Sequence, residues 1–239
     1  MQIDLLRYPL YEFYRAEVSG IRLANAGYGG AVIWPFDKTW TESLRGDVCT
    51  SADAGGFSIG AMLFSAEELA AGSINHAVRF ILPNDRIANR TYVRPGTHTT
   101  GDNTSRWAPA PTNDLTGPPL SDSSLEPGLP YGTRLRLKES FNISNLNGPA
   151  QVVARALKKY GMILADGGEI VLTAKSDAHS SVKYSQLGFS PRSLSSLKVT
   201  DFEVVPPIQP KPFQSGLTFQ PTLIGPMIKV KYLDCYLNN

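Results

Sequence analysis

The chain has 239 residues, of which 42% are hydrophobic and 18% are charged, so it is long enough to bury a sizeable core. Its 23 lysines and arginines and 21 acidic residues give a net charge of +2, which excludes the strong basic field of a nucleic-acid-binding protein. No segment approaches the ~18 consecutive apolar residues of a membrane-spanning helix. The 21 glycines and 18 prolines predict many turns and favour a β-rich fold.

Alternation of apolar and polar residues predicts strands along the first part of the chain, at residues 11–18, 31–34, 73–82 and 91–94. Between them, Ser65 and Glu68 form a capping box that opens a short helix, which Gly72 ends. In the strand predicted over residues 73–82, alternation places His76 on one face and Arg79 on the other.

Residues 130–166 are the most strongly patterned stretch and predict a strand, a helix and a second strand. Leu135 and Leu137 alternate with three basic residues, Arg134, Arg136 and Lys138, as in a strand with one buried face. An apolar stripe predicts the main helix over residues 148–160, with Pro149 in its first turn and Gly161 at its end. A buried strand follows at residues 162–165.

Further strands are predicted at residues 169–174, 202–205 and 227–236, and a short helix at residues 190–197. We therefore expect one mainly β domain over residues 1–239, a β-sandwich or a distorted barrel, with the helix at 148–160 packed on the sheet. A long stretch rich in proline and glycine, residues 95–130, carries Trp107. We interpret it as a long loop of that domain rather than a linker between two domains.

The two cysteines, Cys49 and Cys235, lie near opposite ends of the chain and are consistent with either one disulfide or two buried free thiols. They form no CxxC motif and no cluster with histidine, so neither a metal site nor a cofactor is expected. Three sequons, at Asn89, Asn103 and Asn142, are compatible with secretion.

Four segments together resemble a largely uncharacterised family of secreted bacterial and fungal proteins. They are TSADAGG (residues 50–56), INHAVRF with YVRPGTH (residues 74–80 and 92–98), PYGTRLRLKESFNIS (residues 130–144) and ALKKYGMILADGG (residues 156–168). The resemblance implies an extracellular location and work on extracellular polymers. This chain differs from the family pattern in lacking an N-terminal segment and in having a longer loop at residues 95–130.

The same segments hold the candidate site residues. We expect His76, His98, Arg136 and Asp53 to be catalytic, and Arg79, Arg134, Lys138 and Trp107 to bind substrate. A uronate-specific polysaccharide lyase needs a base, an acid and a cation that neutralises the substrate carboxylate, and histidine, tyrosine (Tyr160) and arginine supply these groups. A glycoside hydrolase needs two carboxylates, for which Asp53 and Asp166 form the best pair.

Simpler interpretations stand beside these. Asp53 fits a turn or a helix cap, Arg134, Arg136 and Lys138 fit the solvated face of a strand, and His76 fits the core. The expected function is action on an extracellular, more specifically acidic, polysaccharide, with no nucleic acid and no membrane as partner. The alternative is a non-catalytic carbohydrate-binding or structural protein in which Trp40, Trp107 and Tyr131 stack on sugar rings.

Overall fold

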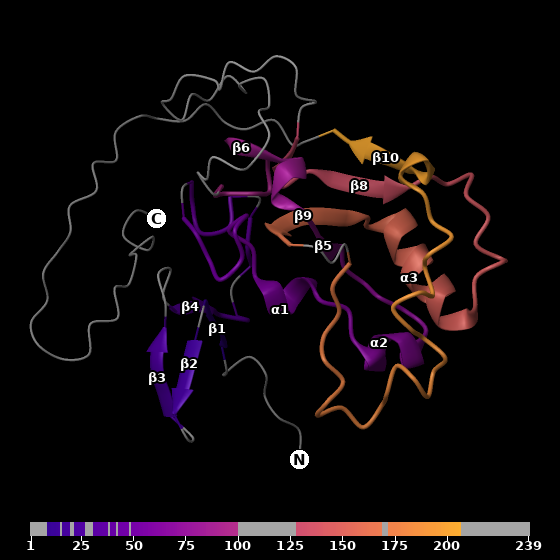
Figure 1. Ribbon diagram of the computed structural model, residues 1–239, viewed down its shortest axis with the longest axis horizontal. Helices are drawn as coiled ribbons and strands as arrows, with labels where there is room; N and C mark the ends of the chain where they lie inside the picture. Colours follow the sequence, from indigo (N-terminus) through magenta and orange to yellow (C-terminus); the bar gives the residue numbers. More distant parts are fainter. Residues whose placement is uncertain are drawn as a thin grey trace, which may run out of the picture.

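The structure, a computed structural model, describes residues 9–14, 16–19, 22–26, 31–37, 39–41, 43–47, 49–99, 128–168 and 172–206. Most of its regular elements are strands, so the protein is mainly β, as expected (Figure 1). The strands are β1 (Leu10–Phe13), β2 (Ala16–Ser19), β3 (Arg22–Ala26), β4 (Ala31–Trp34), β5 (Val78–Leu82), β6 (Ile87–Tyr92), β7 (Leu129–Tyr131), β8 (Arg134–Leu137), β9 (Met162–Gly167) and β10 (Phe202–Val205). The helices are α1 (Ile59–Met62), α2 (Ala66–Ala71), α3 (Gly148–Lys159) and the 3₁₀ turns η2 (Asn84–Arg86) and η3 (Val199–Asp201).

A four-stranded mixed sheet, in the order β10-β8-β9-β5, forms the centre of the fold. β5 is parallel to β9, whereas β8 is antiparallel to both β9 and β10. Three two-stranded sheets, β1-β4, β2-β3 and β6-β7, complete the described part of the chain, in which no barrel closes.

Helix α3 covers one face of the central sheet, as the sequence predicts (Figure 1). It begins where the Asn147 side chain accepts a hydrogen bond from the backbone N–H of Ala150, and Lys158 and Lys159 in its last turn suit the negative end of the helix dipole. Its buried side chains pack on alternate residues of the strands, and the shared core includes Val78, Phe80, Leu137, Val153, Leu157, Met162 and Leu164.

The other face of the sheet carries Arg79 and Ile163, which are paired in register, and Arg134 on β8 is in turn the partner of Ile163. Phe57, from the loop that precedes α1, packs on Ile163 and Ala165 on this face. This loop therefore covers the side of the sheet opposite α3.

A β-bulge interrupts the pairing of β5 with β9. Phe80 pairs with Leu164, but the next residue, Ile81, pairs with Asp166, so Ala165 is the extra residue. Because Ile81 and Arg79 share a face of β5, the bulge brings Asp166 to the face of Arg79 rather than the face of α3.

Buried Glu12 connects the β1-β4 pair to the loop before α1. Its carboxylate accepts hydrogen bonds from the Trp34 indole at 2.9 Å, the Ser58 hydroxyl at 2.9 Å and the Gly60 backbone N–H at 2.8 Å. Three donors compensate for the burial of this charge, so Glu12 holds the amino-terminal strands against the central body.

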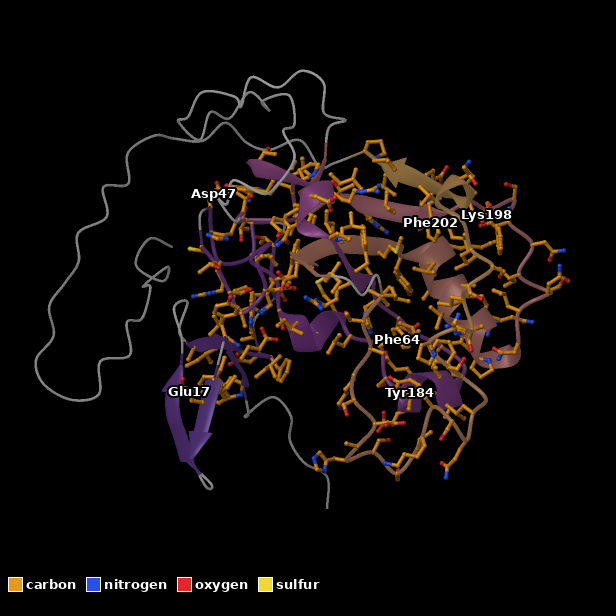
Figure 2. All side chains as sticks on the ribbon, in the orientation of Figure 1. Glu17, Asp47, Phe64, Tyr184, Lys198 and Phe202 are labelled. Atoms are coloured by element: carbon orange, nitrogen blue, oxygen red, sulfur yellow. The ribbon has the colours of Figure 1, made fainter. Side chains whose placement is uncertain are left out.

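Residues 172–198 form an irregular segment that is anchored by aromatic side chains. Figure 2 shows Phe64 and Tyr184 close together beside α2, with ring centroids 6.2 Å apart. The Tyr184 hydroxyl donates to the backbone oxygen of Phe64 or of Lys175, at 3.1 and 2.9 Å. Phe189 adds an edge-to-face contact with Phe64.

Several predicted elements differ from the structure. The strand expected at residues 11–18 is divided into β1 and β2, that at 73–82 begins only at Val78, and residues 190–197 form turns rather than a helix. The strand at 227–236 and most of the loop at 95–130 lie outside the described residues. Within the described part of the chain, no helix has the length and apolar character needed to cross a bilayer.

Candidate functional site

The loop at residues 50–57 places Asp53 against the face of the central sheet that is opposite α3. The Ser51 hydroxyl accepts a hydrogen bond from the Asp53 backbone N–H at 2.9 Å and lies 2.5 Å from the Phe57 carbonyl oxygen, so Ser51 shapes the turn. The Gly55 N–H donates to the carbonyl oxygen of Ala165, the bulged residue, at 2.8 Å. Gly56 has φ +85°, and a Cβ there would lie 2.1 Å from the Thr97 hydroxyl, so this position requires glycine.

Asp53 is fully buried and forms a two-pronged ion pair with Arg79 of β5. Arg79 Nη2 donates to Asp53 Oδ1 at 2.7 Å, and Arg79 Nε donates to Asp53 Oδ2 at 3.1 Å. The exposed fractions of the two side chains are 0% for Asp53 and 7% for Arg79. The Asp53 side chain therefore makes no cap or Asx turn but pairs with Arg79, whereas its backbone does open a turn, because the Asp53 carbonyl oxygen accepts the Gly56 N–H at 3.0 Å.

Asp166 is the solvent-accessible member of the cluster. Its side chain is 32% exposed, and Oδ2 lies 3.5 Å from Arg79 Nη2, the nitrogen that also bonds to Asp53. Asp166 Oδ1 accepts a hydrogen bond from the Gly167 N–H at 2.8 Å. Arg79 Nη1 completes the arrangement by donating to the Thr173 hydroxyl at 3.0 Å.

The electrostatics of this cluster are dominated by burial. Burial raises the pKa of Asp53 to about 8, although the hydrogen bonds and positive charge of Arg79 act in the opposite direction, and the charge of Asp166 adds to the rise. Burial alone lowers the pKa of Arg79, but the hydrogen bonds and negative charge of Asp53 outweigh it, so the net change is upward. Arg79 therefore stays charged, whereas the Asp53 carboxyl group binds a proton readily.

His98 lies at the edge of the same loop. Its Nδ1 is 2.8 Å from the carbonyl oxygen of Ala54, the residue after Asp53, so Nδ1 carries the hydrogen and Nε2 keeps its lone pair. Burial lowers the pKa of His98, while the bond to Ala54 acts in the opposite direction. His98 is therefore a neutral imidazole at pH 7 with Nε2 as the basic atom.

The other predicted site residues have other partners. His76 precedes β5 and bonds through Nε2 to Glu68 of α2 at 3.1 Å and through Nδ1 to the oxygen of Ala77 at 2.8 Å. The basic residues of β8 and Lys138, which follows the strand, bond towards the edge of the sheet and the end of α3. Arg134 bonds to the Tyr160 carbonyl, Arg136 to Glu203, and Lys138 to the Thr200 carbonyl.

The structure thus places Arg79 and His98 in contact with the loop that holds Asp53, and Asp166 beside Arg79. The bonds of Arg136, Lys138 and His76 lead elsewhere, so their convergence on the same site stays a prediction. Trp107 lies outside the described residues. Of the proposed stacking rings, Tyr131 is buried at 1% exposure, and Trp40 packs edge-on against Trp34 with centroids 4.9 Å apart.

Cys49 is disulfide-bonded, so the expectation of free thiols is wrong for this residue. Cys235, the other cysteine of the sequence, lies outside the described residues. The Cys49 carbonyl oxygen accepts a hydrogen bond from the Thr97 hydroxyl at 3.1 Å, so the disulfide is attached next to the loop that holds Asp53.

Thr173 is the member of the cluster that sequence reasoning missed, because a single threonine in a polar stretch carries no distinguishing signal. In the described part of the chain, no group of three histidine, cysteine, aspartate or glutamate side chains is placed to hold a metal ion. The chemistry that these residues offer is proton transfer, with one carboxyl group open to solvent, one buried beside it, and a neutral imidazole nearby.

Comparisons of the chain with protein-family models, with curated proteins and with solved structures gave no match.

Proposed function

We propose that this protein acts on an extracellular polysaccharide, of the acidic class, by acid–base catalysis in which Asp166 exchanges a proton with the substrate. The observation that carries the proposal is the cluster of Asp53, Arg79 and Asp166, in which one carboxyl group reaches solvent and the other is fully buried. Carboxyl groups with such unequal environments are typical of catalytic acids and bases. His98, with Nε2 basic, is the second proton-transfer group.

The burial of Asp53 argues against separate acid and nucleophile roles for the two carboxyl groups. Asp53 has no exposed surface and shares Arg79 Nη2 with Asp166, at 2.7 and 3.5 Å, so Asp53 cannot reach a sugar as the second carboxylate that a glycoside hydrolase needs. In a lyase, the pair supplies the acid that protonates the leaving oxygen, and His98 supplies the base that removes the proton at C5. The cluster therefore favours elimination over hydrolysis.

Basic side chains on the same face of the sheet support an acidic substrate. The register sets Arg134 level with Arg79 across Ile163, and Arg136 follows two residues later on β8. The Arg136–Glu203 ion pair is 48% and 42% exposed at its two side chains, and such surface pairs contribute little to stability. A substrate carboxylate can therefore replace Glu203 as the partner of Arg136.

Two further points belong to the proposal. The disulfide at Cys49 supports secretion, since disulfides persist in oxidising compartments. We also propose that the sheets pack as a sandwich or a distorted barrel when the whole chain is considered.

The alternative, a non-catalytic glycan-binding protein, loses support from the burial of Tyr131 and the packing of Trp40 on Trp34.

The test is incubation with a panel of uronate and neutral polysaccharides, read by the absorbance of unsaturated products and by reducing ends. We expect unsaturated products from a uronate polymer, and a loss of at least about 100-fold for Asp166→Asn, the usual contribution of a positioned acid or base. The control is Asp85→Asn, which removes an exposed carboxylate from η2. Equal activity of Asp166→Asn and the control, or no turnover of any polymer, would contradict the proposal; reducing ends without absorbance would show hydrolysis instead.

A further inference from the structure

We infer that Asp53 and Asp166 share a single proton and act as one acid–base unit, in which Asp53 is a positioning residue and Asp166 exchanges the proton with its surroundings. The statement that this exchange serves a substrate rests on the proposed function, whereas the sharing of the proton does not. Asp53 has no exposed surface, so it acts only through its neighbours.

The cluster holds more acidic groups than basic ones. Two carboxyl groups surround one guanidinium, and Arg79 Nη2 is the common donor, at 2.7 Å from Asp53 Oδ1 and 3.5 Å from Asp166 Oδ2. If both carboxyl groups were ionised, the cluster would carry one uncompensated negative charge, although Asp53 is fully buried. Uptake of one proton restores neutrality, since burial of an unpaired charge is far more costly than protonation.

The neighbouring charged groups supply no second cation. Glu12 of β1 adds negative charge to the surroundings of Arg79, so it does not neutralise a second carboxylate. His98 faces the loop through the Ala54 carbonyl and is neutral, as derived above. Ser51 and Thr173 contribute hydroxyl groups without charge. Among the described residues in contact with the pair, Arg79 is the one cation.

The two carboxyl groups also compete for the same nitrogen. Arg79 Nη2 lies 2.7 Å from Asp53 Oδ1 and 3.5 Å from Asp166 Oδ2, and the negative charge of Asp166 disfavours ionisation of Asp53. The proton therefore belongs to the pair, as in other interacting titratable groups. Asp53 is held by two bonds to Arg79, which fix its carboxyl group beside the nitrogen that Asp166 also approaches.

The proton balance follows directly. Donation from Asp166 to a leaving oxygen converts the pair from one proton to none and leaves two carboxylates on Arg79. Capture of a proton from water, or of the proton that His98 removed from the substrate, returns the pair to one proton, so that the pair and Arg79 together are neutral again. Because the doubly ionised state is unfavourable, the unit recovers its proton readily near neutral pH.

The test is equilibrium unfolding in urea between pH 4 and pH 8 for the wild type, Asp53→Asn, Asp166→Asn and the control Asp85→Asn. A folded state that binds a proton which the unfolded chain has released loses stability as pH rises. We expect the unfolding constants of the wild type and the control to rise by up to about tenfold per pH unit relative to both site variants. Titration of His98 is common to all four proteins and cancels in these differences.

Two results would overturn the inference. If Asp166→Asn keeps the wild-type slope while Asp53→Asn loses it, the proton is on Asp53 alone. If the wild type gains stability with pH relative to Asp53→Asn, the Asp53–Arg79 contact is an ordinary ion pair. Carboxyl ¹³C NMR of the aspartate-labelled wild type needs no substitution: resonances of both residues should shift in the same pH range, and two independent titrations at the ordinary values would refute sharing. Neither measurement depends on turnover, so a failed activity screen would refute the proposed function without testing the shared proton.

Discussion

Replacement of Arg79 by methionine gives the most direct measure of the buried cluster. Methionine keeps an unbranched apolar stem like that of arginine but has no charge, so the substitution leaves Asp53, which has no exposed surface, without its cation. Arg79 donates hydrogen bonds to Asp53, Asp166 and Thr173, and all of these are lost. Removal of one partner from a buried ion pair costs about 3–5 kcal/mol, a large part of the ~5–15 kcal/mol of a typical domain.

The assay is urea unfolding with linear extrapolation at pH 6 and pH 9. We expect a loss near 3 kcal/mol at the lower pH, where protonation relieves the isolated carboxyl group, and a loss near the upper end, about 5 kcal/mol, at the higher pH. A matched control is Arg136→Met, on the same face of the same sheet, whose exposed pair with Glu203 is worth about 0–1 kcal/mol.

A double-mutant cycle of Arg79→Met with Asp53→Asn separates the pair from general packing. Residues in direct contact show interaction energies of about 0.5–3 kcal/mol, and we expect this pair to lie in the upper half of that range. If Arg79→Met costs no more than Arg136→Met, or if the cycle gives no coupling, then the reasoning about a buried charge cluster fails.

Two further predictions concern the loop and its histidine. Gly56→Ala introduces a Cβ against the Thr97 hydroxyl at φ +85° and should destabilise the protein by at least about 1 kcal/mol, measured by thermal unfolding. The control Gly72→Ala, at a left-handed position with open space around it, should show the backbone cost without the clash. His98 should titrate in NMR below its ordinary value of 6.5, and because the folded state then binds fewer protons than the unfolded state, stability present above pH 6.5 should be lost as pH falls below it. A titration of His98 at or above its ordinary value would show that it is not buried as described.

The local elements were largely predictable from the sequence where the signals are short in range. The capping box of Ser65 and Glu68 marks the start of α2, and the apolar stripe of residues 148–160 marks α3, because both depend on neighbours three or four positions apart. Residues 190–197 show the limit of this reasoning. Ser190 and Pro191 resemble a helix start, yet Phe189 packs on Phe64, and that tertiary contact governs the path of the chain.

The site was predictable by residue type but not by partner. Asp53, Arg79, His98 and Asp166 were all identified as polar residues in motif segments, whereas the pairing of Asp53 with Arg79 joins positions 26 residues apart. Nothing in the sequence indicates that these two positions are close in space. Alternation also places the basic residues of β8 on one face of the strand, but it does not show which neighbours they meet.

The extra residue in β9 has an implication for how this protein can vary. A deletion of Ala165 would place Asp166 directly after Leu164, so regular pairing would keep Asp166 opposite Ile81 and on the face of Arg79, while the α3 packing of Met162 and Leu164 stayed the same. The carbonyl that receives the Gly55 N–H would be lost, and with it one attachment of the Asp53 loop to the sheet. A single codon therefore separates a protein whose Asp53 loop is anchored to the bulge from one that keeps its core and the face of Asp166 but loses that anchor.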